Sequence, residues 1–301
     1  MRERFPGRFI MLAALVATTV LVAWPVPDVL AQASDRAIFV SAVDSQGEPV
    51  NGLNVNDFII TEDGRNREVL RVSRAIEPMD IALLADNSAE ATDLVGPLRD
   101  ALRDFVGRMA GDNRVALMTL ADRPTILVDY TTSLIRLEEG IGRLFSMSGS
   151  GMTLLDTLVE VSNGLRQRET TRAVIVPIIT GGVEFSNRRG LDVIDAIQQS
   201  GAALQAFVLG YPNFGGGTMS GRERSVVLDA GTRATGGQHI TLLTESAVKP
   251  ALQKLARQLS SQYKVVYSRP ESLIPPETTE VTSRQPDITT RGTSARGQAG
   301  D

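Results

Sequence analysis

Cysteine is absent from this chain of 301 residues, and histidine, tryptophan and the other aromatic residues are scarce. Without a thiol there is no disulfide framework, no thiolate metal site and no thiol nucleophile. The single histidine, His239, excludes a histidine-rich zinc site and leaves one imidazole for any catalytic triad. Aromatic residues make up 5% of the chain, so an aromatic platform for carbohydrate is poorly supported.

Basic clusters and the common enzyme motifs are missing as well. The net charge is -4 and no run of five basic residues occurs, so a nucleic-acid partner is not expected. The chain has no Gly-x-Ser-x-Gly elbow and no Walker A sequence. We therefore expect no enzyme, and a hydrolase that uses His239 is the least favoured function.

The first 33 residues are typical of a secretory signal. Three arginines precede an apolar run, Phe9–Trp24, and the small-residue motif Ala31–Ala33 follows it. The apolar run would span roughly 24 Å as a helix, less than a bilayer core of about 30 Å. We expect a signal peptide over residues 1–33 and a secreted or periplasmic protein. An uncleaved segment that holds the chain at a membrane is the alternative.

The rest of the chain divides by its apolar pattern. Residues 36–76 alternate like short strands and predict a small β module. Residues 79–268 alternate apolar strands with amphipathic helices, which predicts a doubly wound, mostly parallel six-stranded α/β sheet. The expected strands are 80–85, 114–120, 125–129, 173–180, 203–209 and 263–268. We expect a largely disordered tail over residues 269–301, in which 278–283 could add a strand.

Two local features complete this expectation. Pro177 lies inside an expected strand, and proline has no N–H for the ladder, so we expect a bulge or a missing hydrogen bond there. Residues 211–224, rich in glycine, are expected to form a surface loop.

Polar side chains follow the expected strands at the point where each strand turns into a helix. Ligands bind open α/β sheets at the carboxyl ends of the strands, so these side chains would line one crevice. Hydroxyl and carboxylate oxygens suit a hard cation such as Mg²⁺. The side chains are Asp86, Ser88, Glu90, Thr153, Asp156 and Glu184.

Three sequence stretches resemble the three site loops of a von Willebrand factor type A (VWA) domain. They are "DIALLADNSAE", "GSGMTLLDTL" and "VIVPIITGGVE", in the family's order and spacing. The wider chain resembles the bacterial secreted VWFA-related subgroup of acidobacterial type. The family carries a metal-ion-dependent adhesion site written Asp-x-Ser-x-Ser, then Thr, then Asp. The resemblance implies that Asp86, Ser88 and Thr153 ligate Mg²⁺ and that an acidic side chain of a protein partner completes the ion's shell.

Two positions depart from the family pattern, and they leave alternatives open. Glu90 replaces the second Ser, and Gly181 replaces the later Asp. Glu90 either ligates the ion, or fills the place of the partner's acidic side chain, or belongs to a vestigial site. Asp156 and Glu184 are auxiliary ligand candidates. The resemblance implies an extracytoplasmic protein-binding module of adhesion type; a metal-free structural or assembly protein of the cell envelope is the alternative.

Overall fold

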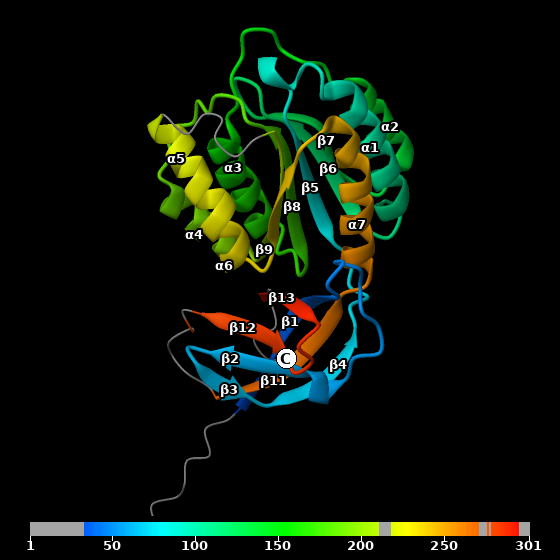
Figure 1. The fold of residues 1–301 in the computed structure, drawn as a ribbon, viewed down its shortest axis with the longest axis vertical. Coiled ribbons are helices and arrows are strands. Elements are labelled where there is room, and N and C mark those ends of the chain that lie inside the picture. Colours follow the sequence, from blue (N-terminus) through cyan, green and yellow to red (C-terminus); the bar gives the residue numbers. More distant parts are fainter. Residues whose placement is uncertain (1–32, 211–217, 271–275, 277, 295–301) are drawn as a thin grey trace, which may run out of the picture. The chain divides into compact units, whose positions relative to one another are not determined.

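The computed structural model describes residues 33–210, 218–270, 276 and 278–294. These residues form a six-stranded, largely parallel sheet with helices on both faces, and a smaller β region (Figure 1). The expected α/β class and doubly wound sheet are therefore confirmed. The expected signal segment, apart from Ala33, lies outside the described residues. In the part of the chain that is described, no helix has the length and apolar character needed to cross a membrane.

The six-stranded sheet has the strand order β10-β9-β8-β5-β6-β7. All neighbouring pairs are parallel except β6 and β7, which are antiparallel. The strands are β5 (Asp80–Ala85), β6 (Arg114–Thr119), β7 (Thr125–Thr131), β8 (Ala173–Thr180), β9 (Ala202–Leu209) and β10 (Gln238–Leu242).

Strand β5 shows how the sequence builds two apolar layers from one strand. All six of its residues are buried, because helices cover both faces of the sheet. Successive side chains of a strand point to opposite faces. Ile81, Leu83 and Ala85 therefore join one core, whereas Ala82 and Leu84 join the other.

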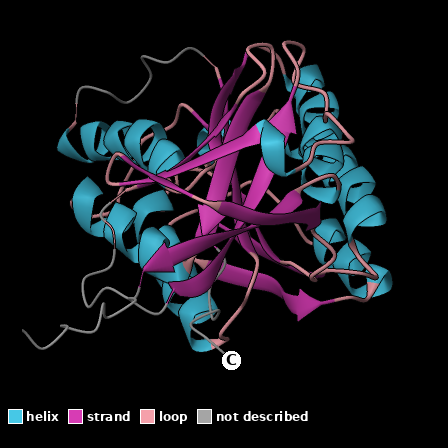
Figure 2. Ribbon diagram, turned by 90° about the horizontal axis from the view of Figure 1, so that it is seen from below, coloured by secondary structure: helices cyan, strands magenta, loops and turns pink. Residues whose placement is uncertain are grey.

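The helices divide between these two cores (Figures 1 and 2). The first core packs against α1 (Val95–Met109), α2 (Leu134–Gly142) and α7 (Val248–Ser260). The second core packs against α3 (Leu154–Gln167) and α4 (Gly190–Ser200). It also receives the segment formed by α5 (Met219–Val226), the π-helical turn η3 (Val227–Gly231) and α6 (Thr232–Ala234).

The sixth strand of the main sheet differs from the expected one. The strand expected at 263–268 exists as β11 (Tyr263–Pro270), but it pairs with β1 and β4 in the smaller region. Its alternate residues Tyr263, Val265 and Tyr267 are buried in that region's own core, which is the pattern of a half-buried strand. The sixth place belongs to β10, an edge strand whose polar residues hid it from the apolar pattern.

The small β region expected before the α/β domain is present, but it consists of two sheets that strands from the C-terminal part of the chain complete. One has the order β13-β1-β11-β4 and the other β12-β2-β3. The strands from the first part of the chain are β1 (Ala33–Val43), β2 (Phe58–Glu62), β3 (Arg65–Arg67) and β4 (Val69–Arg74). The C-terminal part adds β11, β12 (Thr279–Ser283) and β13 (Thr289–Ser294).

The expectation of a largely disordered tail is wrong for residues 279–283 and 289–294. Strand β12 pairs with β2, so the strand that residues 278–283 could add does form. Strand β13 pairs with β1. Backbone N–H and C=O groups make these ladders, so they form despite few large apolar side chains. Val281 is the exception, since it is buried in the region's core.

Two further local expectations meet different outcomes. The ladder between β8 and β9 omits Val176 and Pro177 but keeps the same register on both sides, so Pro177 interrupts the ladder without a bulge. The loop expected over 211–224 is wrong from residue 219 onward, where α5 begins after its N-cap Thr218. Residues 211–217 lie outside the described residues.

Candidate functional site at the carboxyl edge of the sheet

The three loops that carry the expected site residues meet at the carboxyl edge of the main sheet, the upper end in Figure 1. The loop after β5 is bonded to the loop before α3, because Met147 N donates to Asn87 O at 2.8 Å. The loop before α3 is bonded in turn to the loop after β8, because Met152 N donates to Val183 O at 2.9 Å. The sequence order of the motifs therefore gave the correct neighbours in space.

Asp86 is fully buried at the centre of these loops. Its Oδ1 accepts a hydrogen bond from Ser88 N at 2.9 Å. Its Oδ2 accepts two, from Thr180 N at 2.9 Å and from Thr180 Oγ1 at 2.5 Å. The carboxylate thus ties the end of β5 to the end of β8, a role that needs no metal ion.

Ser88 and Thr153, the two hydroxyl residues of the expected site, differ in how they are bonded. Thr153, the N-cap of α3, donates its hydroxyl to Leu120 O at 2.8 Å. Ser88 is fully buried, and its Oγ has no hydrogen-bond partner among the described residues. A buried hydroxyl without a partner is costly, so Ser88 Oγ is the one atom here whose state favours a bound ligand.

Glu90, the replacement for the family's second Ser, lies against Gly182. A Cβ on Gly182 would come within 3.1 Å of Glu90 Oε2 and 3.3 Å of its Cδ. The second glycine of the Gly181-Gly182 pair therefore provides the space that the longer Glu90 side chain occupies. Glu90 is an exposed residue, whereas Asp86 is fully buried.

The other two acidic candidates are bonded to groups of their own. Asp156 Oδ1 forms an ion pair with Arg188 Nε at 2.6 Å on the first turn of α3. Glu184 is buried, and its Oε1 accepts from Ser186 N at 3.2 Å while its Oε2 has no partner among the described residues. Burial raises the pKa of Glu184, against the opposing effects of the Ser186 hydrogen bonds and the Arg224 charge.

Arg224 on α5 is a site residue that the sequence pattern did not reveal. It is buried, and its Nη1 donates to Gly182 O at 2.6 Å. Burial lowers the pKa of Arg224, whereas the nearby carboxylates of Glu184 and Asp86 act to raise it. A helical reading of residues 219–228 would have marked Arg224, because Val227 and Leu228, three and four positions later, are buried on the same side.

The residues present do not fit Mg²⁺ as a resident group of this site. The Ser88 hydroxyl would suit an ion, but both oxygens of Asp86 and the hydroxyl of Thr153 already take part in hydrogen bonds within the protein. The charge of the Arg224 guanidinium already acts on Asp86 and Glu184, so a divalent ion bound to Asp86 would be repelled by a like charge. The ligand roles expected for Asp86, Ser88 and Thr153 therefore stay predictions.

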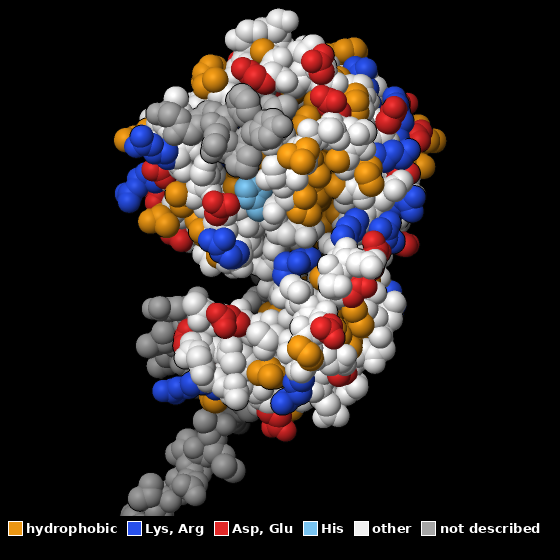
Figure 3. Space-filling view, viewed as in Figure 1, with side chains coloured by type: hydrophobic (Ala, Val, Ile, Leu, Met, Phe, Trp, Pro, Cys, Tyr) orange, Lys and Arg blue, Asp and Glu red, His pale blue; other side chains and the backbone are white. Residues whose placement is uncertain are grey.

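Large apolar side chains are exposed around this buried polar centre. Phe145 and Met147 precede α3 and are 64% and 45% exposed, and Val183 and Phe185 follow β8 and are 40% and 59% exposed. The Arg99 guanidinium carbon lies 4.7 Å from the centroid of the Phe145 ring. At this upper end, Figure 3 shows exposed apolar side chains next to acidic ones. We call the four residues the apolar rim.

His239 lies apart from the loops that form the site. It is on the edge strand β10, and its Nδ1 is 2.9 Å from Asp229 Oδ1. That pairing gives the imidazole a structural partner.

Residues 81–184 match the family model described as the von Willebrand factor type A domain. The matched segment runs from β5 to Glu184 and contains all three site loops. This match supports a VWA domain in the chain, as the resemblance implied. No curated protein matches the chain.

Several solved structures are similar to this chain at low sequence identity. The protein BatB of Bacteroides thetaiotaomicron is 13% identical, with a TM-score of 0.44 over 61% of this chain and 100% of that one. The vWF domain of the type V pili tip protein Mfa5 from Porphyromonas gingivalis is 10% identical, with a TM-score of 0.44 over 62% and 96%. A von Willebrand factor type A protein from Catenulispora acidiphila is 10% identical, with a TM-score of 0.49 over 89% and 68%.

Proposed function

We propose that this chain is a protein-binding module of adhesion type that works outside the cytoplasm and binds its partner with the carboxyl edge of the main sheet. The single observation that carries the proposal is the apolar rim. Its four side chains stand on two loops that are hydrogen-bonded to each other above one buried polar centre. The extracytoplasmic part of the proposal rests on the signal-like residues 1–33, and the subgroup resemblance agrees with it.

Exposed apolar side chains gathered in one place are unusual on a surface that only meets water. Aromatic residues and methionine are enriched at protein interfaces, where they supply most of the contact energy. Loops held by a rigid scaffold are the usual position for binding residues. Here the scaffold is the fully buried pair of strands β5 and β8, and the loops that follow them carry the exposed side chains.

The polar centre below the rim sets the positions of the loops that form this surface. Asp86 joins the loop after β5 to Thr180, and the loop after β8 begins at Thr180. Partner contact therefore depends on Asp86 through loop position. Because Arg224 already brings a positive charge to this centre, the metal-free form of the function is favoured, whether the partner is an adhesion target or an envelope assembly.

A photo-crosslinking residue placed at Phe185 tests this function. Ile135 is the matched control position, because it is 70% exposed on α2 and lies outside the rim. Irradiation in the native envelope should give one discrete protein adduct from position 185 and none from position 135. Folded Asp86→Ala protein should lose that adduct.

Two results would contradict the proposed function. Equal adducts from positions 185 and 135 would mean that the rim has no preferred contact. A complete lack of adducts from position 185, with full-length protein present, would mean that the rim faces solvent in its native setting.

A further inference from the structure

We propose that Arg224 is the permanent cation of this site, and that its guanidinium replaces the divalent ion and fastens α5 to the loop that carries Val183 and Phe185. The inference deepens the proposed function, on which it rests only where it speaks of the partner. It goes beyond the family resemblance, which assigns the positive charge to a metal.

The first observation is the place where Arg224 is bonded. Gly181 stands where the family pattern has a carboxylate side chain after the Thr. At the next residue, Gly182, the backbone carbonyl accepts a hydrogen bond from Arg224 Nη1 at 2.6 Å. A planar guanidinium has five N–H donors and no acceptor, so it suits a centre built of carbonyl and carboxylate oxygens.

The second observation is the balance of charge. Arg224 is 5% exposed, and arginine is almost never buried so deeply unless it is paired. The carboxylates that act on it are Glu184, at 3% exposure, and Asp86, at 0%. The charges of Asp86, a residue of the expected metal site, and of Glu184, a second buried acidic group, therefore both act on this guanidinium.

The third observation is that neighbouring residues of α5 hold both ends of one loop. Arg224 bonds to Gly182 at the start of the loop after β8, and Glu223 Oε2 accepts from Gly190 N at 2.5 Å at the loop's end. Val183 and Phe185 lie between these two points. These two contacts from α5 thus hold in place the loop that carries Val183 and Phe185, the two residues of the apolar rim that follow β8.

The helical segment is shaped to make this contact. Directly after α5 the chain forms the π-helical turn η3, whose Val227 and Leu228 are buried in the second core. A π-helical turn inserts one residue into a helix and changes the direction of the side chains before it, and such turns are frequent at functional sites. The turn lets Val227 and Leu228 pack in the core while Arg224 reaches Gly182.

A double-mutant cycle on the isolated protein tests the role of Arg224. Asp86→Asn keeps side-chain size while removing a charge, Arg224→Gln removes a charge while keeping a shorter amide donor, and thermal unfolding is followed in the presence of EDTA. Arg224→Gln should lower the Tm by about 4 °C or more in the wild-type background, and by clearly less in the Asp86→Asn background. Arg222→Ala, at an exposed position on the same helix, is the matched control and should leave the Tm unchanged.

A titration of the wild-type protein and of Asp86→Asn with Mg²⁺ and with Mn²⁺ completes the test. The wild-type Tm should be the same in EDTA and in millimolar Mg²⁺ or Mn²⁺. Equal Tm losses for Arg224→Gln in both backgrounds would overturn the proposal, because they would make Arg224 a structural residue that is independent of Asp86. A rise of the wild-type Tm with either metal that Asp86→Asn abolishes would also overturn it.

These results are separable from a failure of the proposed function. The cycle and the titration measure the isolated protein, whereas the crosslinking at position 185 measures contact with a partner. If the double-mutant cycle shows coupling between Arg224 and Asp86 but position 185 gives no adduct, the role of Arg224 as the cation of the site stands. Only the proposed binding of a partner by the rim is then contradicted.

Discussion

Strand β5 carries a fully buried aspartate at each end, and the two are stabilised in opposite ways. Asp80 is its first residue, and Asp86 directly follows its last. Both are 0% exposed, so each must have its charge and hydrogen-bonding capacity satisfied within the protein.

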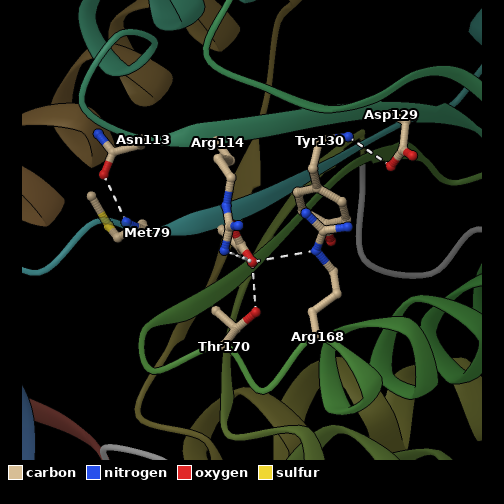
Figure 4. A network of polar contacts seen from close by, with 8 residues as sticks. Met79, Asn113, Arg114, Asp129, Tyr130, Arg168 and Thr170 are labelled. Carbon is tan, nitrogen blue, oxygen red and sulfur yellow. Dashed lines mark hydrogen bonds and ion pairs between the residues drawn. The ribbon is translucent and has the colours of Figure 1, made fainter.

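Asp80 is held by charged side chains that bond to it directly. Arg114 donates to both carboxylate oxygens, at 2.5 and 2.8 Å, and Thr170 Oγ1 donates at 2.5 Å. Arg168 Nε lies 3.5 Å away, and its guanidinium carbon is 4.4 Å from the centroid of the Tyr130 ring. Figure 4 shows Arg114 on β6 and Arg168 and Thr170 in the connection between α3 and β8 pointing toward one another.

Asp86 is bonded instead by neutral donors, which are Ser88 N and the N–H and hydroxyl of Thr180. The guanidinium whose charge acts on it belongs to Arg224 and donates to Gly182 O. The Asp80 end of β5 thus carries a structural ion cluster, whereas the Asp86 end carries a polar centre that positions loops. Exposed apolar side chains of the rim lie around the Asp86 end. The difference teaches that burial of a carboxylate does not by itself indicate a functional site. The exposed loops around the carboxylate indicate it.

The largest expected effect on stability comes from a change at Asp80, at the start of β5. Asp80→Ala should lower the free energy of unfolding by about 3–5 kcal/mol, because it breaks an ion cluster whose carboxylate is fully buried. Urea denaturation measures the loss. Asp129→Ala, an exposed neighbour in Figure 4, is the control and should stay within about 0.5 kcal/mol. Loss of the position-185 adduct in folded Asp80→Ala protein would erase the contrast between the two ends.

The next effect is at the other end of the same strand. Asp86→Ala should cost about 2–3 kcal/mol of unfolding free energy, because it leaves the Thr180 donors without an acceptor. Unlike Asp80→Ala, it should also abolish the adduct at position 185. If folded Asp86→Ala protein keeps a full adduct, the polar centre does not shape the rim.

A smaller, pH-dependent effect is expected at Glu184. Its folded-state pKa is raised above the ordinary 4.5, so the folded protein binds a proton that the unfolded chain has released. Its contribution to stability therefore falls as the pH rises from about 4.5 through the raised pKa. Glu184→Gln should remove this fall and stabilise the neutral-pH protein on the order of 1 kcal/mol. Urea denaturation at a series of pH values is the measurement, and an unchanged pH profile would contradict the assignment.

The smallest effect on stability is expected from the rim itself. Phe145→Ser combined with Phe185→Ser should change the unfolding free energy by about 0.5 kcal/mol, because both side chains are mostly exposed. The same variant should lose the adduct from a crosslinker placed at Val183. Ile135→Ser is the control and should keep it. A double variant that still forms the adduct would place the binding surface elsewhere.

The sequence was informative where apolar burial or motif order decides the structure. Strands β5 and β8 were predictable because helices on both faces demand continuous apolar runs. The meeting of the loops that carry Asp86 and Thr153 was predictable, because carboxyl ends of parallel strands share one edge and the motif order identified the loops.

The parts that escaped prediction depend on backbone pairing or on long-range packing. Strand β10 is an edge strand of polar character, and β13 forms by ladder bonds to β1 with polar side chains. Neither leaves an apolar signature. Arg224 lies more than 130 residues from Asp86 in sequence, and only the folded helix α5 brings the two charges together.

A crystal structure of the wild-type chain grown with Mn²⁺, with anomalous scattering measured, tests the central claim most directly. The account predicts no anomalous peak among Asp86, Ser88 and Thr153, with Arg224 bonded to Gly182 O beside them. An anomalous peak coordinated by those three side chains, with Arg224 displaced from Gly182, would contradict it.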